Sequence, residues 1–319
     1  MKVLAEKAVA VKLDAKDKAI LSSIVKNVRK PLSKIAKEVS LSRQSVEYRI
    51  NQMKKQQLLV GSRTVVNTRK LGYQTYHVFL NTIQEQALVE RATKAEFVNA
   101  IILYSGKYRF EISIMARSPD EFTKSYQKLV SGLNISESDS LLLYAPMKSM
   151  VLPGIVGEEK VVKEKNYSPD QTDIKLLKLL SNDATLSKTA LAKTLKLSKD
   201  AISYRMNNLI ASKYIIEFRP AINFSVMGNT IHAILFQLND GSTNIHDFEV
   251  FLKGSDSILW AVKSFGYYDY LVYVITKDVS ELHELINEIK KKYGDVINSY
   301  ELLFAYSELK YQFMADSIS

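Results

Sequence analysis

The segment KIAKEVSLSRQSVEYRINQMKK (34–55) recurs 156 residues further on as ALAKTLKLSKDAISYRMNNLIA (190–211), and these two segments are the strongest indication of the fold. Each segment predicts a short helix, a tight turn and a second helix. In the second helix of the first segment, Val46 and Met53 lie on one apolar stripe, and Ser42 stands directly before the helix as an N-cap. Another helix precedes each segment, which completes the pattern of a helix-turn-helix domain.

The repeat covers nearly the whole chain, which indicates one structural unit written twice. At the same shift Gly72 aligns with Gly228, and SGKYRFEISIMA (105–116) matches FGYYDYLVYVIT (265–276) at a shift of 160 residues. The segment PMKSMVLPGIVGEEKVVKEKN (146–166) combines prolines, glycines and a charged run, and it therefore predicts a linker. We refer to the residues before and after this segment as copy one and copy two.

After each helix-turn-helix, the periodicity predicts elements in the order β-α-β-β-α-β, which is that of a ferredoxin-like domain. In copy one the expected elements are strand 75–82, helix 85–95, strand 101–104, strand 109–116, helix 118–131 and strand 140–147. In copy two they are 232–239, 244–253, 258–265, 268–276, 279–293 and 297–306. Helices cover one face of such a sheet. The other face is also expected to be apolar and to need a partner, with side chains such as Phe79, Ile112, Ile114, Leu271 and Tyr273.

The predicted fold class is therefore α+β, with two winged helix-turn-helix domains alternating with two ferredoxin-like βαββαβ domains. The expected boundaries are 1–68 for the first helix-turn-helix domain, 69–147 for the first ferredoxin-like domain, 148–166 for the linker, 167–225 for the second helix-turn-helix domain and 226–319 for the second ferredoxin-like domain.

Positive charge is concentrated in the two helix-turn-helix segments. The chain has a net charge of +10, and residues 1–72 alone carry 17 Lys and Arg against 5 Asp and Glu. Residues 167–228 carry 9 against 5, residues 73–146 carry 7 against 8, and residues 229–319 carry 7 against 13. This segregation predicts a polyanionic partner, namely double-stranded DNA, that copy one binds more strongly than copy two.

Other functional classes lack their signatures in this sequence. It contains no Cys, which excludes disulfides and thiolate metal sites. It has no apolar run of the roughly 20 residues that span a membrane, and its first residues do not have the pattern of a signal peptide. Glycine-rich phosphate loops, metal-binding His pairs and nucleophile elbows do not occur, so no catalytic residue, metal or cofactor is predicted. We expect a cytoplasmic, nucleoid-associated protein without a membrane partner.

These motifs resemble the Lrp/AsnC family, the leucine-responsive or feast/famine regulators of bacteria and archaea. The matching segments are DKAILSSIVKN, KIAKEVSLSRQSVEYRI, KLGY and SGKYRFEISIMA in copy one, and DIKLLKLLSND, ALAKTLKLSKDAISYRM, VMG and FGYYDYLVYVIT in copy two. The resemblance covers almost all of residues 13–310, and it implies a transcriptional regulator whose sensor domains pair through their sheets. One chain can then form a built-in pseudo-dimer, or two chains can pair copy with copy, and the pseudo-dimeric chains are expected to form homo-oligomers.

The expected DNA contacts lie on the outer face of the last helix of each helix-turn-helix domain. Polar side chains there read bases, and flanking Arg and Lys bind phosphates. Gln pairs with adenine, whereas Asp200 accepts from cytosine but repels phosphates, so copy two is expected to bind more weakly. Tyr48 and Tyr204 have an alternative role, packing half-buried against their own domain. The predicted residues are Ser42, Arg43, Gln44, Ser45, Tyr48, Arg49 and Gln52 in copy one, and Ser198, Lys199, Asp200, Tyr204, Arg205 and Asn208 in copy two.

The resemblance also implies a small-molecule effector, such as an amino acid, at the glycine turn before the third strand of each sensor sheet. The residues concerned are Gly266, Tyr268 and Asp269 in copy two, and Gly106 and Arg109 in copy one. Asp269 would meet an ammonium group, and the Arg at the matching position of copy one departs from this pattern. The alternative is that both segments are hairpin turns in which Gly supplies the backbone angle.

Two other functions remain open at this point. A chromatin-like architectural protein with little sequence preference fits the lysine-rich first segment. Siroheme decarboxylases resemble the family in fold, but such an enzyme would need a basic, His-containing tetrapyrrole pocket, and the acidic second sensor segment argues against one. His77 and His232 lie in the first sensor strands, where they are expected to be ordinary strand residues.

Overall fold

The computed structural model of the chain describes residues 11–148 and 165–319, so the expected linker lies almost entirely outside the described residues. The described residues divide into two compact units. The helix-turn-helix unit contains residues 11–73, 165–223 and 312–319. The ferredoxin-like unit contains residues 74–148 and 224–311.

The unit boundaries differ slightly from the expected domain boundaries. The chain changes unit after Tyr73 and after Asn223, close to the expected positions 68 and 225. The last eight residues, 312–319, belong to the helix-turn-helix unit, although the sequence places them in the second ferredoxin-like domain. Met314 and Ile318 of this segment are buried, and Lys178 of the helix-turn-helix unit donates a hydrogen bond to the carbonyl oxygen of Asp316 at 2.8 Å.

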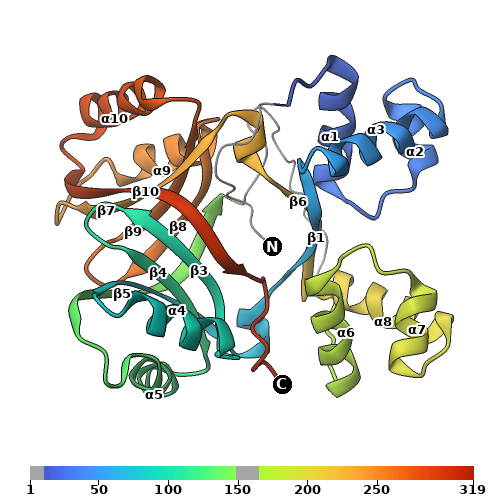
Figure 1. Ribbon diagram of the computed structural model, residues 1–319, viewed down its shortest axis with the longest axis horizontal. Coiled ribbons are helices and arrows are strands. Elements are labelled where there is room, and N and C mark those ends of the chain that lie inside the picture. Colours follow the sequence, from blue (N-terminus) through green and yellow to red (C-terminus); the bar gives the residue numbers. More distant parts are fainter. Residues whose placement is uncertain (1–10, 149–164) are drawn as a thin grey trace. The chain divides into compact units, whose positions relative to one another are not determined.

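The helix-turn-helix unit contains both copies of the motif (Figure 1). Copy one contributes α1 (Ala15–Lys26), α2 (Leu32–Glu38), α3 (Arg43–Lys55), strand β1 (Leu59–Val66) and the 3₁₀ helix η1 (Thr68–Leu71). Copy two contributes α6 (Gln171–Asn182), α7 (Lys188–Leu195), α8 (Lys199–Ala211) and strand β6 (Ile215–Ile222). The predicted order of three helices is confirmed in both copies.

Side-chain caps explain where these helices begin. Ser42 and Ser198 each accept a hydrogen bond from the third backbone N–H of the helix that follows, at 3.0 and 3.1 Å. Asp14 and Asp170 form capping boxes at the starts of α1 and α6. Because a lost N-cap typically costs about 1 kcal/mol, these polar residues fix the start of each helix.

A ladder between the copies holds the helix-turn-helix unit together. The sequence predicts a short strand pair or wing at 58–67, but the segment forms one strand, β1, whose partner is β6 of copy two (Figure 1). The antiparallel register places Arg63 opposite Arg219, the residue that follows it by 156 positions. The helices are exchanged across the ladder, since α6 packs on β1 and α1 packs on β6. Each copy therefore completes the core of the other.

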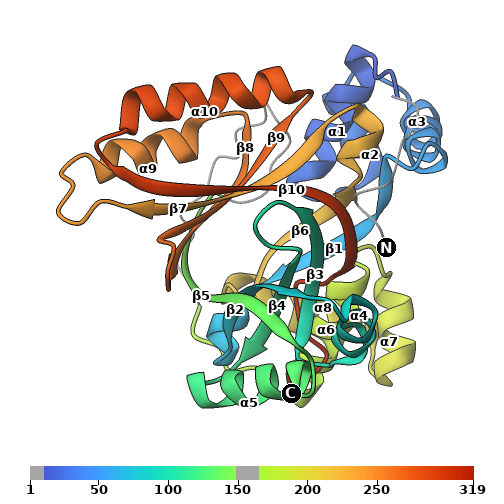
Figure 2. The same ribbon diagram turned by 60° about the vertical axis from the view of Figure 1, so that its left-hand side comes forward.

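The ferredoxin-like unit confirms the predicted β-α-β-β-α-β order twice. Copy one contributes β2 (Gln74–Thr82), α4 (Glu85–Lys94), β3 (Val98–Ser105), β4 (Phe110–Ala116), α5 (Pro119–Val130) and β5 (Ile135–Lys148). Copy two contributes the 3₁₀ helix η2 (Phe224–Met227), β7 (Thr230–Leu238), α9 (Ile245–Gly254), β8 (Ile258–Phe265), β9 (Tyr270–Thr276), α10 (Val279–Tyr293) and β10 (Ile297–Tyr311). In Figure 2, α4 and α5 lie on the strands of copy one, and α9 and α10 on those of copy two.

The two sheets join into one closed arrangement with the strand order β10-β3-β4-β2-β5-β8-β9-β7. The long last strands make the joins, because β5 pairs first with β2 and then with β8, and β10 pairs first with β7 and then with β3. Of the two alternatives that the sequence leaves open, the structure therefore has the sheets of one chain paired with each other.

Each sheet has two apolar faces, as the sequence predicts, but two residues lie on the opposite face from the one expected. Ile112 and Ile114 pack with Leu88 and Leu129 in the core beneath α4 and α5. Ile112 lies opposite Val78 of β2, and Ile114 lies opposite Tyr76. Because side chains alternate along a strand, these residues, which are two positions apart, share one face of the sheet. Phe79 is fully buried on the face that meets the other copy.

His232 is buried in β7 and gives this unit a predicted pH dependence. Its Nε2 lies 3.0 Å from the hydroxyl of Thr230, and its ring packs edge-on against Phe304. Burial lowers the pKa of His232 to about 4, from an ordinary value of 6.5. The neutral ring therefore stabilises the fold fully above about pH 6.5, and this stabilisation is lost as the pH falls towards 4.

Between pH 7 and 4, we expect the unfolding free energy of the wild type to fall by about 3 kcal/mol more than that of His232→Gln, which has no titrating ring. Urea unfolding of both proteins at several pH values measures this difference. Parallel pH profiles for the two proteins would contradict the prediction.

Candidate nucleic-acid interface

The last helix of the first helix-turn-helix motif, α3, buries one face and exposes the other. Val46 and Met53 are buried, whereas Arg43 and Gln44 are exposed and Ser45 is half-buried at the start of the helix. The ring of Tyr48 is 64% exposed, and that of Tyr204 in copy two is 65% exposed. These values exclude the alternative in which the two tyrosines pack half-buried against their own domains. They leave two aromatic rings on surfaces rich in polar groups.

The outer face of α8 has the same layout with different chemistry. Lys199, Asp200 and Tyr204 are exposed, as predicted. Asn208 is buried, however, and its Oδ1 accepts a hydrogen bond from the ammonium group of Lys165 at 2.8 Å. The prediction that Asn208 faces outward is therefore wrong, because this position faces the domain core at the end of the helix. Gln52, the matching residue of α3, is half-buried.

Arg49 and Arg205, predicted to bind phosphates, make ion pairs within their own domains. The Arg49 guanidinium bonds both Asp14 and Asp17 at 2.7 Å. Arg205 bonds the matching carboxylates, those of Asp170 and Asp173, at 2.8 and 2.9 Å. These bonds tie the last helix of each motif to its first helix. A phosphate contact by either arginine stays a prediction.

The same ion pair affects the carboxyl group of Asp14. A hydrogen bond from the backbone N–H of Asp17 and one from the side chain of Arg49 lower the pKa of Asp14. The ionised form of Asp14 is thereby favoured, which also suits its position at the N-terminus of α1. The guanidinium of Arg49 therefore holds the start of α1 against α3, next to the face proposed to contact DNA.

The predicted effector turns lie where the two copies of the ferredoxin-like unit meet. Gly106 and Gly266 have φ angles of +137° and +154°. A Cβ atom on Gly266 would lie 2.5 Å from the carbonyl oxygen of Ser140, on the last strand of the other copy. One on Gly106 would lie 3.0 Å from the carbonyl oxygen of Leu302. The packing therefore explains why glycine occupies both positions, because each turn lies directly against the backbone of the opposite copy.

The side chains of these turns are already engaged. Asp269 accepts a hydrogen bond from the backbone N–H of Leu238 at 2.7 Å. Arg109 pairs with Glu85 at 3.2 Å and lies over the ring of Tyr306. Tyr268 is buried, and its hydroxyl lies 3.3 Å from the ammonium group of Lys107 in the turn of copy one. The turns of the two copies are therefore neighbours, while the two charged residues predicted to meet an effector bind protein groups.

A buried polar cluster on the facing sheets was not predicted from the sequence. The carboxylate of Glu111, which is 1% exposed, accepts hydrogen bonds from the hydroxyls of Tyr104 and Tyr273 and contacts Nδ1 of His77, each at 2.5 Å. Burial raises the pKa of both tyrosines well above the ordinary value, so both hydroxyls keep the protons that they donate. The sequence signal is a lone acid within the apolar strand FEISIMA (110–116).

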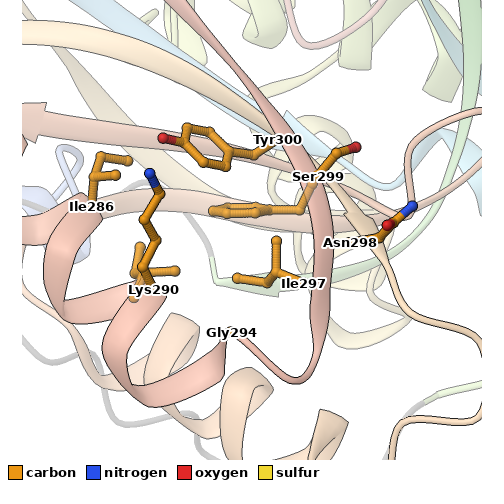
Figure 3. A pocket seen from close by; sticks show the side chains of 9 residues that line it. Ile286, Lys290, Gly294, Ile297, Asn298, Ser299 and Tyr300 are labelled. Atoms are coloured by element: carbon orange, nitrogen blue, oxygen red, sulfur yellow. The ribbon is translucent and has the colours of Figure 1, made fainter.

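A cavity of about 510 Å³ lies between the end of α10 and the start of β10 (Figure 3). Phe236, Ile286 and Ile297 give it an apolar wall, and the ammonium group of Lys290 lies 5.1 Å from the centre of the Tyr300 ring. The lining residues include none of those predicted for an effector. Within residues 11–148 and 165–319, no three His, Asp or Glu side chains gather as a metal site would need, and no helix is both long and apolar enough to cross a membrane.

The geometry of the paired, capped helices defines a helix-turn-helix protein, and comparison with known proteins agrees. Residues 13–54 match the AsnC-type helix-turn-helix domain, and residues 169–216 match a winged helix-turn-helix DNA-binding domain. The transcriptional regulator LrpA of Pyrococcus horikoshii is 30% identical over 112 residues, which cover 34% of this chain and 79% of the relative. The regulator LysM of Saccharolobus solfataricus is 28% identical over 131 residues, covering 41% and 90%. The chain belongs to the Lrp/AsnC family.

Among solved structures, that of the siroheme decarboxylase NirDL has a TM-score of 0.62 and covers 94% of both chains, at 14% sequence identity. A second structure of that enzyme, with an iron-uroporphyrin III analogue, gives the same TM-score at 13% identity. At such low identity the likeness concerns the fold alone. It extends over both copies, whereas LrpA and LysM each correspond to less than half of the chain.

The contact of Gly266 with the other copy predicts a large effect of a small substitution. We expect Gly266→Ala to lower the unfolding free energy by about 3 kcal/mol, because the new methyl group meets the Ser140 carbonyl and the backbone angle is strained. Gly72→Ala is the control, since Gly72 also has a positive φ angle, +82°, but a Cβ atom there meets no atom within 4 Å. Thermal and urea unfolding measure both variants, and equal losses would contradict a packing role for Gly266.

Proposed function

We propose that this chain regulates transcription by binding double-stranded DNA in a sequence-dependent manner through α3 and α8. The observation that carries the proposal is the pair of capped helices whose exposed faces present amide, hydroxyl, aromatic and cationic groups within the two basic segments. Such helices fit the major groove, and their first residues reach base edges. The named regulators among the relatives support the same function.

In this proposal, α3 makes most of the contacts. The amide of Gln44 pairs with adenine, Ser45 and Tyr48 contact neighbouring bases, and Arg43 binds a phosphate at the start of the helix. Copy two binds more weakly, because its helix-turn-helix segment carries much less net positive charge and Asp200 adds a carboxylate to the outer face.

Removing the amide of Gln44 should weaken binding to a selected operator. We expect Gln44→Ala to raise the Kd about tenfold for that operator and less than twofold for random DNA, because only the operator contact is specific. Gln86→Ala is the control, since Gln86 is also an exposed glutamine and lies on α4 of the ferredoxin-like unit. Fluorescence anisotropy at fixed salt measures both. Equal weakening on both DNAs would instead favour a chromatin-like architectural role.

The charge difference between the copies predicts unequal salt dependences. Removing the exposed cations Lys37 and Arg43 together should reduce the slope of log Kd against log salt concentration by about 2, because each phosphate contact contributes about 0.9. Removing their exposed counterparts in copy two, Lys193 and Lys199, should reduce it by about 1 or less. The comparison uses two variants of the full chain: Lys37→Gln with Arg43→Gln, and Lys193→Gln with Lys199→Gln. Equal reductions for the two pairs would refute the proposed difference between the copies.

We further propose that the chain is not an enzyme. A decarboxylase of the siroheme type would need a histidine available in a basic pocket, but His77 contacts the buried Glu111 and His232 lies buried beside Thr230 and Thr276. The cavity near Lys290 has no histidine among its lining residues. The arrangement of these side chains therefore supports a regulator over an enzyme.

Effector binding and self-association also belong to this proposal. The neighbouring turns around Lys107 and Tyr268 are the place at which a small molecule such as an amino acid would act, as implied by the family. Phe265 and Tyr267 are 76% and 55% exposed beside these turns, which supports assembly of pseudo-dimeric chains into larger homo-oligomers. The proposed site of action is the nucleoid, in the cytoplasm.

A further inference from the structure

The two helix-turn-helix motifs are related by a pseudo-two-fold axis through the β1–β6 ladder. At its midpoint, Arg63 lies opposite its own counterpart in copy two. Asn67 donates its backbone N–H to the carbonyl of Tyr214 at 2.9 Å. The counterparts of these two residues, Asn223 and Leu58, form the same bond in the other direction, also at 2.9 Å. Reciprocal contacts of this kind define two-fold symmetry, so α3 and α8 are inverted relative to each other.

Hydrogen bonds between the copies hold this arrangement. The guanidinium of Arg29, which follows α1, donates to the carbonyl oxygens of Ala184 and Leu186 at 2.5 and 2.9 Å. The hydroxyl of Thr64 on β1 donates to the carbonyl oxygen of Leu180 at 2.7 Å. Together with the exchanged packing of α1 and α6, these bonds fix α8 with respect to α3. One chain therefore presents two recognition helices as one body.

The two helices are symmetric in position but not in the groups that they present. At matching outer positions, α3 has Arg43, Gln44 and Ser45 where α8 has Lys199, Asp200 and Ala201. The amide Gln44 favours adenine, whereas the carboxylate of Asp200 accepts a hydrogen bond from the cytosine amino group. Other exposed residues are shared, namely tyrosine at 48 and 204 and asparagine at 51 and 207. The two helices are thus suited to different base sequences.

The ferredoxin-like unit favours the pairing of unlike copies. Glu111 of copy one is satisfied by the hydroxyl of Tyr273 from copy two. The residue of copy one that aligns with Tyr273, at the shift of 160, is Ser113, and the residue of copy two that aligns with Glu111 is Leu271. Two copy-one sheets face to face would therefore bury two carboxylates without this tyrosine. Each Glu111 would then keep only Tyr104 and His77 of its own copy, and because a buried carboxyl group is less stable when it loses a hydrogen-bond donor, the observed pairing of copy one with copy two is favoured.

From these observations, we infer that a single chain reads an operator made of two inverted but unlike half-sites, so that the operator has a direction. A homodimeric regulator with identical helices selects a palindrome. Here the inverted geometry is kept, while the sequences read by α3 and α8 differ. The inference rests on the proposed sequence-dependent DNA binding, and it specifies the form of the DNA partner.

Selection of binding sites from random double-stranded DNA with the full chain tests the inference. We expect the wild type to enrich an inverted site with two different halves. The variant Lys199→Arg, Asp200→Gln, Ala201→Ser gives α8 the first three residues of α3, and it should enrich a palindrome of the copy-one half-site. Its affinity for that palindrome should exceed that of the wild type at least about tenfold.

The reverse variant Arg43→Lys, Gln44→Asp, Ser45→Ala is the matched control, and it should enrich a palindrome of the copy-two half-site. All six substituted positions are exposed or half-buried, and thermal unfolding verifies that both variants fold. A palindrome or direct repeat selected by the wild type, or an unchanged motif in both variants, would overturn the inference. Tight binding by the wild type with no enriched sequence would instead refute the proposed sequence-dependent function on which the inference rests.

Discussion

The second apolar face of each ferredoxin-like sheet must be covered, and most of the ferredoxin-like unit follows from how this happens. Helices protect one face only, so a single copy would leave Phe79 and its neighbours in water. The long strands β5 and β10 solve this by continuing past their own sheet and pairing with β8 and β3 of the other copy. The turn glycines lie against those same strands, which is why Gly266 has no room for a side chain. Pairing of the copies is thus a condition of folding rather than a later association.

Periodicity predicted the elements well, because most helices and strands here have one strongly apolar stripe and a polar cap. It could not predict partners that are distant in sequence. The sequence of segment 58–67 does not indicate that its partner strand is β6. The alternating side chains of β1 and β6 are compatible with pairing to many other strands. The burial of Asn208 depends on the packing of its domain and on the hydrogen bond from Lys165. A helical wheel of α8 includes neither of these contacts. Glu111 is visible in the sequence as an acid among apolar residues, but the tyrosine that satisfies it comes from the other copy.

Comparing the two copies within one chain separates structural from recognition residues. Arg49 and Arg205 make the same pair of ion bonds to the first helix of their motif, and the serine caps before α3 and α8 are also the same. The chemistry is kept at these positions because each motif needs it to hold its helices together. The outer positions 44 and 200 carry an amide in one copy and a carboxylate in the other, since exposure leaves them without a packing constraint. The surface that we propose to contact DNA therefore includes positions that are free to diverge.

Joining two copies in one chain removes a restriction that a homodimer cannot escape. In a homodimer every substitution occurs twice about the axis, so a buried acid would face a symmetric environment with a second acid. A buried carboxylate is tolerated only when donors surround it, and here Tyr104 and Tyr273 supply them from opposite copies. In this chain, the acid lies in copy one and one of its donors lies in copy two. The same freedom allows α3 to gain cations while α8 gains Asp200, because the fold no longer requires the two helices to be alike.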